Sequence, residues 1–123
     1  LKGEGDLVLS YTTSPAYHLI EEKKSNYAAA NFSEGHYLQV EVAGQVASSK
    51  QPQLAQRFMQ FIVTPAFQDH IPTGNWMYPV IKMDLPAGFA TLTVPQKALQ
   101  FDAKDVADNR SKWIQAWQSA VSH

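Results

Sequence analysis

The sequence predicts an α/β fold, and three patterns support this class. Residues 6–12 form a short apolar run rich in strand formers, and this run leads directly into the helix-start residues Ser14 and Pro15. Residues 37–43 alternate polar and apolar side chains, which is the period of a strand with one buried face. Two later segments repeat apolar residues at steps of three and four, which is the period of an amphipathic helix.

Composition narrows the class of protein further. The chain has 123 residues, of which 45% are hydrophobic and 17% charged, so it has the composition of a folded chain with a core. Ten Lys and Arg against 11 Asp and Glu give a formal charge of -1, so no net positive field attracts nucleic acid or an anionic membrane. The chain contains no cysteine, which excludes disulfides and thiolate metal sites. It begins at Leu1 within a few residues of a predicted strand, so we expect a fragment of a longer chain.

The first elements follow from local signals. We expect a strand over residues 6–12, and then a helix that Ser14 caps, with Pro15 in its first turn, as far as about residue 23. Residues 26–35 have the composition of a loop, and the alternation over residues 37–43 predicts the second strand.

The second half of the chain is predicted to contain three helices. The stretch 48–52 opens a helix whose apolar stripe should face the core, and Thr64 and Pro65 open a short helix to about residue 70. Residues 71–79 are expected to form a turn-rich loop, and residues 80–101 look irregular. Asp102 should cap a last helix, in which the spacing of Trp113 and Trp117 predicts a core-facing side.

Aromatic residues at the ends of strands and in loops are the most informative functional candidates. Tyr11 lies near the C-terminal end of the first predicted strand, and Tyr17 lies in the first turn of the following helix, where open α/β sheets place ligands. Packing between strand and helix is the alternative for these two tyrosines. Trp76 lies in the proline-flanked loop, which provides little regular structure to bury it. The helix start at Ser14 is a natural place for an anion.

Signals for catalysis or metal binding are weak. The sequence has no GxSxG, P-loop or GxGxxG motif, and its histidines lack the close spacing of metal ligands. The apparent carboxylate pairs are explained by a solvated helix face at Glu21 and Glu22, and by a helix cap at Asp102 and Asp105. The sequence therefore predicts a binding cleft, with no catalytic residues, no metal and no cofactor.

Three stretches, residues 6–18, 27–43 and 71–80, closely resemble the C-terminal part of the periplasmic thiamine-binding proteins of enterobacterial ABC importers. The resemblance implies a two-lobed α/β fold like that of type II periplasmic binding proteins, with this chain a C-terminal fragment that contributes to both lobes. By analogy, residues 1 to about 36 and about 82–123 would form part of one lobe, and about 37–81 part of the other. It also implies a periplasmic location and delivery of thiamine, thiamine monophosphate or thiamine diphosphate to a membrane permease.

The resemblance also identifies candidate ligand contacts. Tyr11, Tyr17 and Trp76 match aromatic contacts of the family, and Ser14 and His18 are further candidates. Tyr37 and the neighbouring His36 lie where the chain is expected to cross from one lobe to the other. Tyr37 could pack at the hinge there or contact the ligand. Aromatic faces suit thiamine because they can stack on its flat aminopyrimidine and attract its cationic thiazolium. The helix start near Ser14 would then receive a phosphate tail.

Two other readings remain open at this point. A binding protein of the same architecture could take another organic cation or ferric iron, although Thr12 follows Tyr11 where iron would favour a second adjacent tyrosine. A hydrolase lobe acting on phosphate esters would need a nucleophile with a base, and only Ser14 and His18 are close enough in sequence. Because a missing lobe would leave apolar surface uncovered, we also expect the fragment to self-associate.

Overall fold

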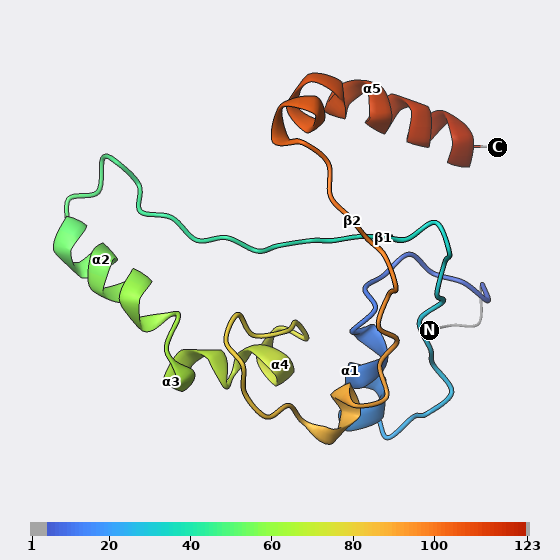
Figure 1. Cartoon of the computed structure of the whole chain (residues 1–123), viewed down its shortest axis with the longest axis horizontal. Coiled ribbons are helices and arrows are strands. Elements are labelled where there is room, and N and C mark those ends of the chain that lie inside the picture. Colours follow the sequence, from blue (N-terminus) through green and yellow to red (C-terminus); the bar gives the residue numbers. More distant parts are fainter. Residues whose placement is uncertain (1–4, 123) are drawn as a thin grey trace.

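Helices make up most of the regular structure in residues 5–122, the part of the chain that this computed structural model describes. Figure 1 shows an open arrangement, in which a long extended stretch leads from β1 out to α2, and α3 and α4 lead back toward α1. The elements in chain order are α1 (Ser14–Ile20), β1 (His36–Tyr37), α2 (Pro52–Phe61), α3 (Pro65–Gln68), α4 (Ile71–Gly74), η1 (Ala87–Phe89), β2 (Ala98–Leu99) and α5 (Ala103–Val121). No helix within residues 5–122 is long and apolar enough to cross a membrane.

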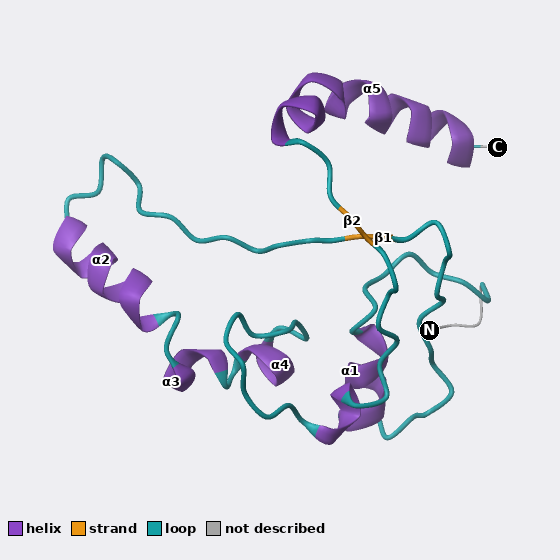
Figure 2. Ribbon diagram, in the orientation of Figure 1, coloured by secondary structure: helices purple, strands orange, loops and turns teal. Residues whose placement is uncertain are grey.

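The β-structure is much smaller than the sequence predicts. β1 and β2 pair in parallel, with His36 opposite Ala98, and Figure 2 shows how short this ladder is. Of the strand predicted over residues 37–43, only the first residue is paired, and the strand predicted over residues 6–12 is not assigned. Residues 38–43 and 6–12 have no neighbouring strand among the described residues, and Leu7 and Leu9 are each 89% exposed. The predicted α/β class is therefore present only as a minimal ladder among helices.

The small core lies where α1 meets η1. Ala16 on α1 is fully buried and packs with Phe89, the last residue of η1, and with Leu92, which follows η1. Ile20 and Trp76 pack against this cluster. The two elements come so close because Gly88 has no side chain at their contact.

Helix α1 differs from its prediction at both ends. Thr13, not Ser14, is the N-cap residue, and its side chain makes no capping hydrogen bond. The helix ends at Ile20, earlier than the predicted end near residue 23. Lys23 has a left-handed backbone with φ of 57°, and the N–H of Lys24 bonds to the carbonyl of His18 at 2.9 Å, which closes the helix end.

The predicted start of α5 is confirmed, whereas its predicted core-facing side is not. The Asp102 carboxylate accepts from the backbone N–H of Lys104 at 2.9 Å and of Asp105 at 3.2 Å. Trp113 and Trp117 are 43% and 57% exposed, and no residue of α5 is buried. Figure 1 shows why, since this helix lies apart from the other described elements.

The arm formed by α2, α3 and α4 also leaves its apolar side uncovered. α2 begins at Pro52, as expected, but it buries no residue, so the prediction of a core-facing stripe is wrong for the described chain. Within the arm, the rings of Phe58 and Phe61 both meet Phe67 of α3 edge to face. α3 ends at Gln68, short of residue 70, and part of the predicted loop 71–79 is the single turn α4.

Buried Gln68 fixes the chain on both sides of α4. Its Nε2 donates to the carbonyl of Ile62 at 2.7 Å, and its Oε1 accepts from the N–H of Val80 at 2.8 Å. The ends of the stretch that carries Trp76 are therefore held by one side chain, which limits how far this stretch can move.

Candidate functional site

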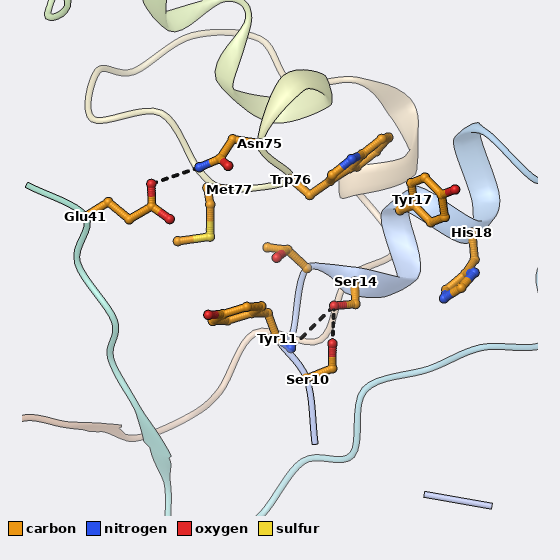
Figure 3. A pocket seen from close by; sticks show the side chains of 10 residues that line it. Ser10, Tyr11, Ser14, Tyr17, His18, Glu41, Asn75, Trp76 and Met77 are labelled. Carbon is orange, nitrogen blue, oxygen red and sulfur yellow. Dashed lines mark hydrogen bonds between the residues drawn. The ribbon is translucent and has the colours of Figure 1, made fainter. Parts of the chain in front are cut away.

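A cavity of about 480 Å³ lies between the start of α1, the extended stretch after β1 and the loop after α4 (Figure 3). It brings together five of the six residues that the sequence selects as ligand contacts. The lining residues are Ser10, Tyr11, Thr13, Ser14, Tyr17, His18, Glu41, Asn75, Trp76 and Met77. These come from three separate stretches of the chain, so only the folded chain forms this surface.

Three aromatic side chains define the apolar part of the cavity. The rings of Tyr17 and Trp76 meet edge to face, with centroids 5.2 Å apart and planes at 86°. Tyr11 precedes α1 on the chain, and its ring lies apart from these two in Figure 3. Tyr11 and Tyr17 are 53% and 39% exposed, so both side chains remain accessible to a ligand.

Trp76 is held in an unusual backbone conformation. Its φ of 55° is left-handed, which costs a residue with a Cβ about 1–2 kcal/mol. The Trp76 side chain contacts the core cluster and Tyr17, and these contacts offset the cost. The backbone just before Trp76 is held as well, because the N–H of Asn75 donates to the carbonyl of Ile71 at 3.0 Å. The indole is thus fixed in place before any ligand arrives.

Ser14 lines the cavity, but not as a helix cap. Its Oγ accepts from the backbone N–H of Tyr11 at 3.3 Å and shares a hydrogen bond with Ser10 Oγ at 2.6 Å. These bonds hold the chain just before α1 in a tight turn, which sets the position of Tyr11.

His18 is held on the outer side of α1. Its Nδ1 lies 2.9 Å from Glu22 Oε2, and its ring lies over Tyr27 with centroids 4.0 Å apart. Hydrogen bonds from His18 and Lys24 lower the pKa of the Glu22 carboxyl, and the same contact with Glu22 raises the pKa of Lys24. No hydrogen bond joins His18 to Ser14, and each has other partners, so the described residues do not form a nucleophile and base pair.

Glu41 and Asn75 line the cavity and were not selected from the sequence. Asn75 Nδ2 donates to Glu41 Oε2 at 2.9 Å, across 34 positions of the chain. Among the described residues that line the cavity, Glu41 is the only one with a carboxylate, and none is Lys or Arg. The available signals were its polar position in the alternating stretch 37–43 and the place of Asn75 directly before Trp76.

Tyr37 and Tyr78 lie outside this cavity. Tyr37 stacks on Phe101, with centroids 5.9 Å apart, and lines a second hollow of about 560 Å³ beside the β1 and β2 ladder. Tyr78 meets Phe89 edge to face at 5.6 Å, and burial raises the pKa of the Tyr78 hydroxyl. The structure therefore separates Tyr37 from the other five predicted contacts. Within residues 5–122, no group of three or more acidic or histidine side chains is arranged to hold a metal ion.

Comparison with known proteins gives close relatives but no matching family model. The chain is 70% identical over 122 residues to the thiamine-binding periplasmic protein of Escherichia coli strain K12, and 67% identical to that of Salmonella typhimurium. The protein of the same name from Haemophilus influenzae is 46% identical over 123 residues. The resemblance noted in the sequence is thereby confirmed.

A solved structure agrees with these relatives. A periplasmic thiamin binding protein matches 99% of this chain with a TM-score of 0.92 and 69% sequence identity. The chain covers 38% of that structure, and it spans 37% of the length of each of the three relatives. The open arrangement of helices and extended stretches is thus also the arrangement of the corresponding residues in a larger protein.

Proposed function

We propose that this chain supplies one wall of the ligand site of a periplasmic solute-binding protein that captures thiamine for import. The observation that carries the proposal is the meeting of Tyr11, Tyr17 and Trp76 in one cavity. The names of its relatives support the same ligand and the same compartment.

The chemistry of the cavity suits thiamine. Its thiazolium is permanently cationic, and an aromatic face attracts such a cation by about 0.5–2 kcal/mol. Its aminopyrimidine is flat and can stack on a second ring. The cavity volume of about 480 Å³ falls within the range of small-molecule sites.

The proposal extends to the architecture of the whole protein. We infer a two-lobed fold of the type II periplasmic binding kind, with residues 1 to about 36 and about 82–123 in one lobe and about 37–81 in the other. This division is supported by α2 and α3, which lie within 37–81 and away from α1 and η1 (Figure 1). The lobes would close on the ligand, and the closed form would dock on an ABC permease.

The phosphate esters of thiamine are part of the same proposal. Ser10 and Ser14 place hydroxyls on the cavity wall, and a hydroxyl can donate to a phosphate oxygen. The protein would act by binding alone, so we expect no phosphate release when it is incubated with thiamine diphosphate.

Calorimetric titration with thiamine tests the proposal, using the protein in the full length that its gene encodes. Trp76→Ala should weaken binding tenfold or more, about 1.4 kcal/mol, because it removes a fixed aromatic anchor. Trp76→Phe keeps an aromatic face and should lose less. Thermal unfolding of both variants checks that they fold.

Two results would count against the proposal. Unchanged affinity in a folded Trp76→Ala variant would remove Trp76 from the site. Absence of thiamine binding by the wild-type protein would defeat the proposed function as a whole.

A further inference from the structure

One hydrogen bond connects the extended stretch after β1 to the loop that carries Trp76. Asn75 Nδ2 donates to Glu41 Oε2 at 2.9 Å, and Figure 3 shows this bond at the edge of the cavity across from α1. Among the described residues, it is the only hydrogen bond made by any residue from 39 to 45. This contact alone therefore ties that stretch to the cavity.

The Trp76 loop needs support from outside itself. A left-handed tryptophan persists only where neighbouring contacts determine its backbone, and Trp76 has a φ of 55°. Asn75, the residue before it, is held by its N–H on the carbonyl of Ile71 and by its side chain on Glu41. Loss of the second contact would leave Asn75 free to turn, and the peptide joining it to Trp76 would turn with it.

We propose that Glu41 is a positioning residue for the ligand site, acting through Asn75 to fix the indole of Trp76. This inference rests on the proposed function for its ligand, although the positioning itself is a property of the ligand-free protein. The bond is made by a carboxylate oxygen, but an amide oxygen at the same place would also accept it. The hydrogen bond, rather than the negative charge, is therefore the feature that matters.

Two substitutions separate the hydrogen bond from the charge. Glu41→Ala removes both and should weaken thiamine binding about fivefold to tenfold, the net effect of losing one ordinary hydrogen bond. Glu41→Gln removes only the charge and should stay within about twofold of wild type. Glu34→Ala is the matched control, because the Glu34 carboxylate accepts from Ser33 Oγ at 3.2 Å and does not line the cavity as the described residues form it.

A spectroscopic measurement reports on Trp76 without any ligand. The protein is labelled with fluorotryptophan, and its fluorine NMR signals are assigned with a Trp76→Phe variant. The Trp76 signal should move or broaden in Glu41→Ala and stay in place in Glu41→Gln and Glu34→Ala. A role limited to overall stability would not single out this one signal.

The possible outcomes distinguish this inference from the proposed function. If Glu41→Gln binds thiamine as weakly as Glu41→Ala, the charge acts on the ligand directly and the positioning role is overturned. Wild-type affinity in Glu41→Ala, or an unmoved Trp76 signal, overturns it as well. If the wild-type protein does not bind thiamine, the proposed function fails, while the NMR comparison still decides whether Glu41 positions Trp76.

Discussion

Gly88 allows α1 and η1 to pack closely, because it has no side chain at their contact. A Cβ at this position would lie 2.6 Å from Cγ1 and 2.7 Å from Cδ1 of Ile20. Ile20 and Trp76 both pack against the cluster of Ala16, Phe89 and Leu92. A change in the distance between α1 and η1 would therefore also shift the indole of Trp76, which lines the cavity.

We predict that Gly88→Ala lowers the free energy of unfolding by about 1–3 kcal/mol, the usual effect of overfilling a close contact. Gly44→Ala is the control, because a Cβ there would meet nothing within 4 Å. Denaturant unfolding of the two variants measures the difference. Equal stability of Gly88→Ala and wild type would show that α1 and η1 are not in this close contact.

The single residues of the site differ in how well the sequence predicts them. Tyr11 and Tyr17 were predictable because both lie close to the start of α1, which local signals mark, and both do line the cavity. Glu41 was not predictable because its partner Asn75 lies 34 positions away, and only the fold brings them together. Tyr37 was selected where the chain is expected to cross between lobes, and the structure places it in β1, which pairs in parallel with β2, with its ring stacked on Phe101.

At the scale of elements, the end of α1 is held by a small charged cluster. Glu22 lies 2.9 Å from His18 and 3.2 Å from Lys24, and their hydrogen bonds lower its pKa from the ordinary value of 4.5. A carboxyl whose pKa is lowered by folding stabilises the folded state above its unfolded pKa. That contribution is lost as the pH falls through the lowered folded value.

Comparison of wild type with Glu22→Gln should show this dependence. The variant should have a lower thermal midpoint near neutral pH, and the two midpoints should converge as the pH falls below 4.5, where wild-type Glu22 also becomes neutral. The difference should be small because the group is exposed. Glu21→Gln, an exposed neighbour, should show no such convergence. A gap that stays constant at low pH would contradict the role of the Glu22 charge.

Elements were predictable from sequence to the extent that local signals determine them. Proline at the start of α2 and the Asp102 carboxylate at the start of α5 mark their helices without help from other parts of the fold. Strands need a partner, and the stretches 6–12 and 37–43 have the composition of strands, but apart from Tyr37 they have no strand to pair with in residues 5–122. Their composition is consistent with pairing in a larger protein.

For the molecule as a whole, most of the apolar surface is uncovered. In the part of the chain that the structure describes, the core contains three buried hydrophobic residues, whereas α2 and α5 bury none. Exposed apolar faces of this size drive association with other polypeptide. We therefore predict that the 123-residue chain alone forms dimers or larger assemblies.

Light scattering over a range of concentrations measures this association. Replacing Phe58 on α2 and Trp117 on α5 with glutamate should shift the chain toward monomer, because charge on an apolar face opposes its burial. A wild-type chain that stays monomeric at every concentration would contradict the prediction.

A crystal structure of the protein, in the full length that its gene encodes and with thiamine bound, would test the aromatic site most directly. We expect a thiamine ring in the cavity, within about 6 Å of the ring centroid of Tyr11, Tyr17 or Trp76. Thiamine bound elsewhere, with all three of these aromatic residues out of contact, would contradict it.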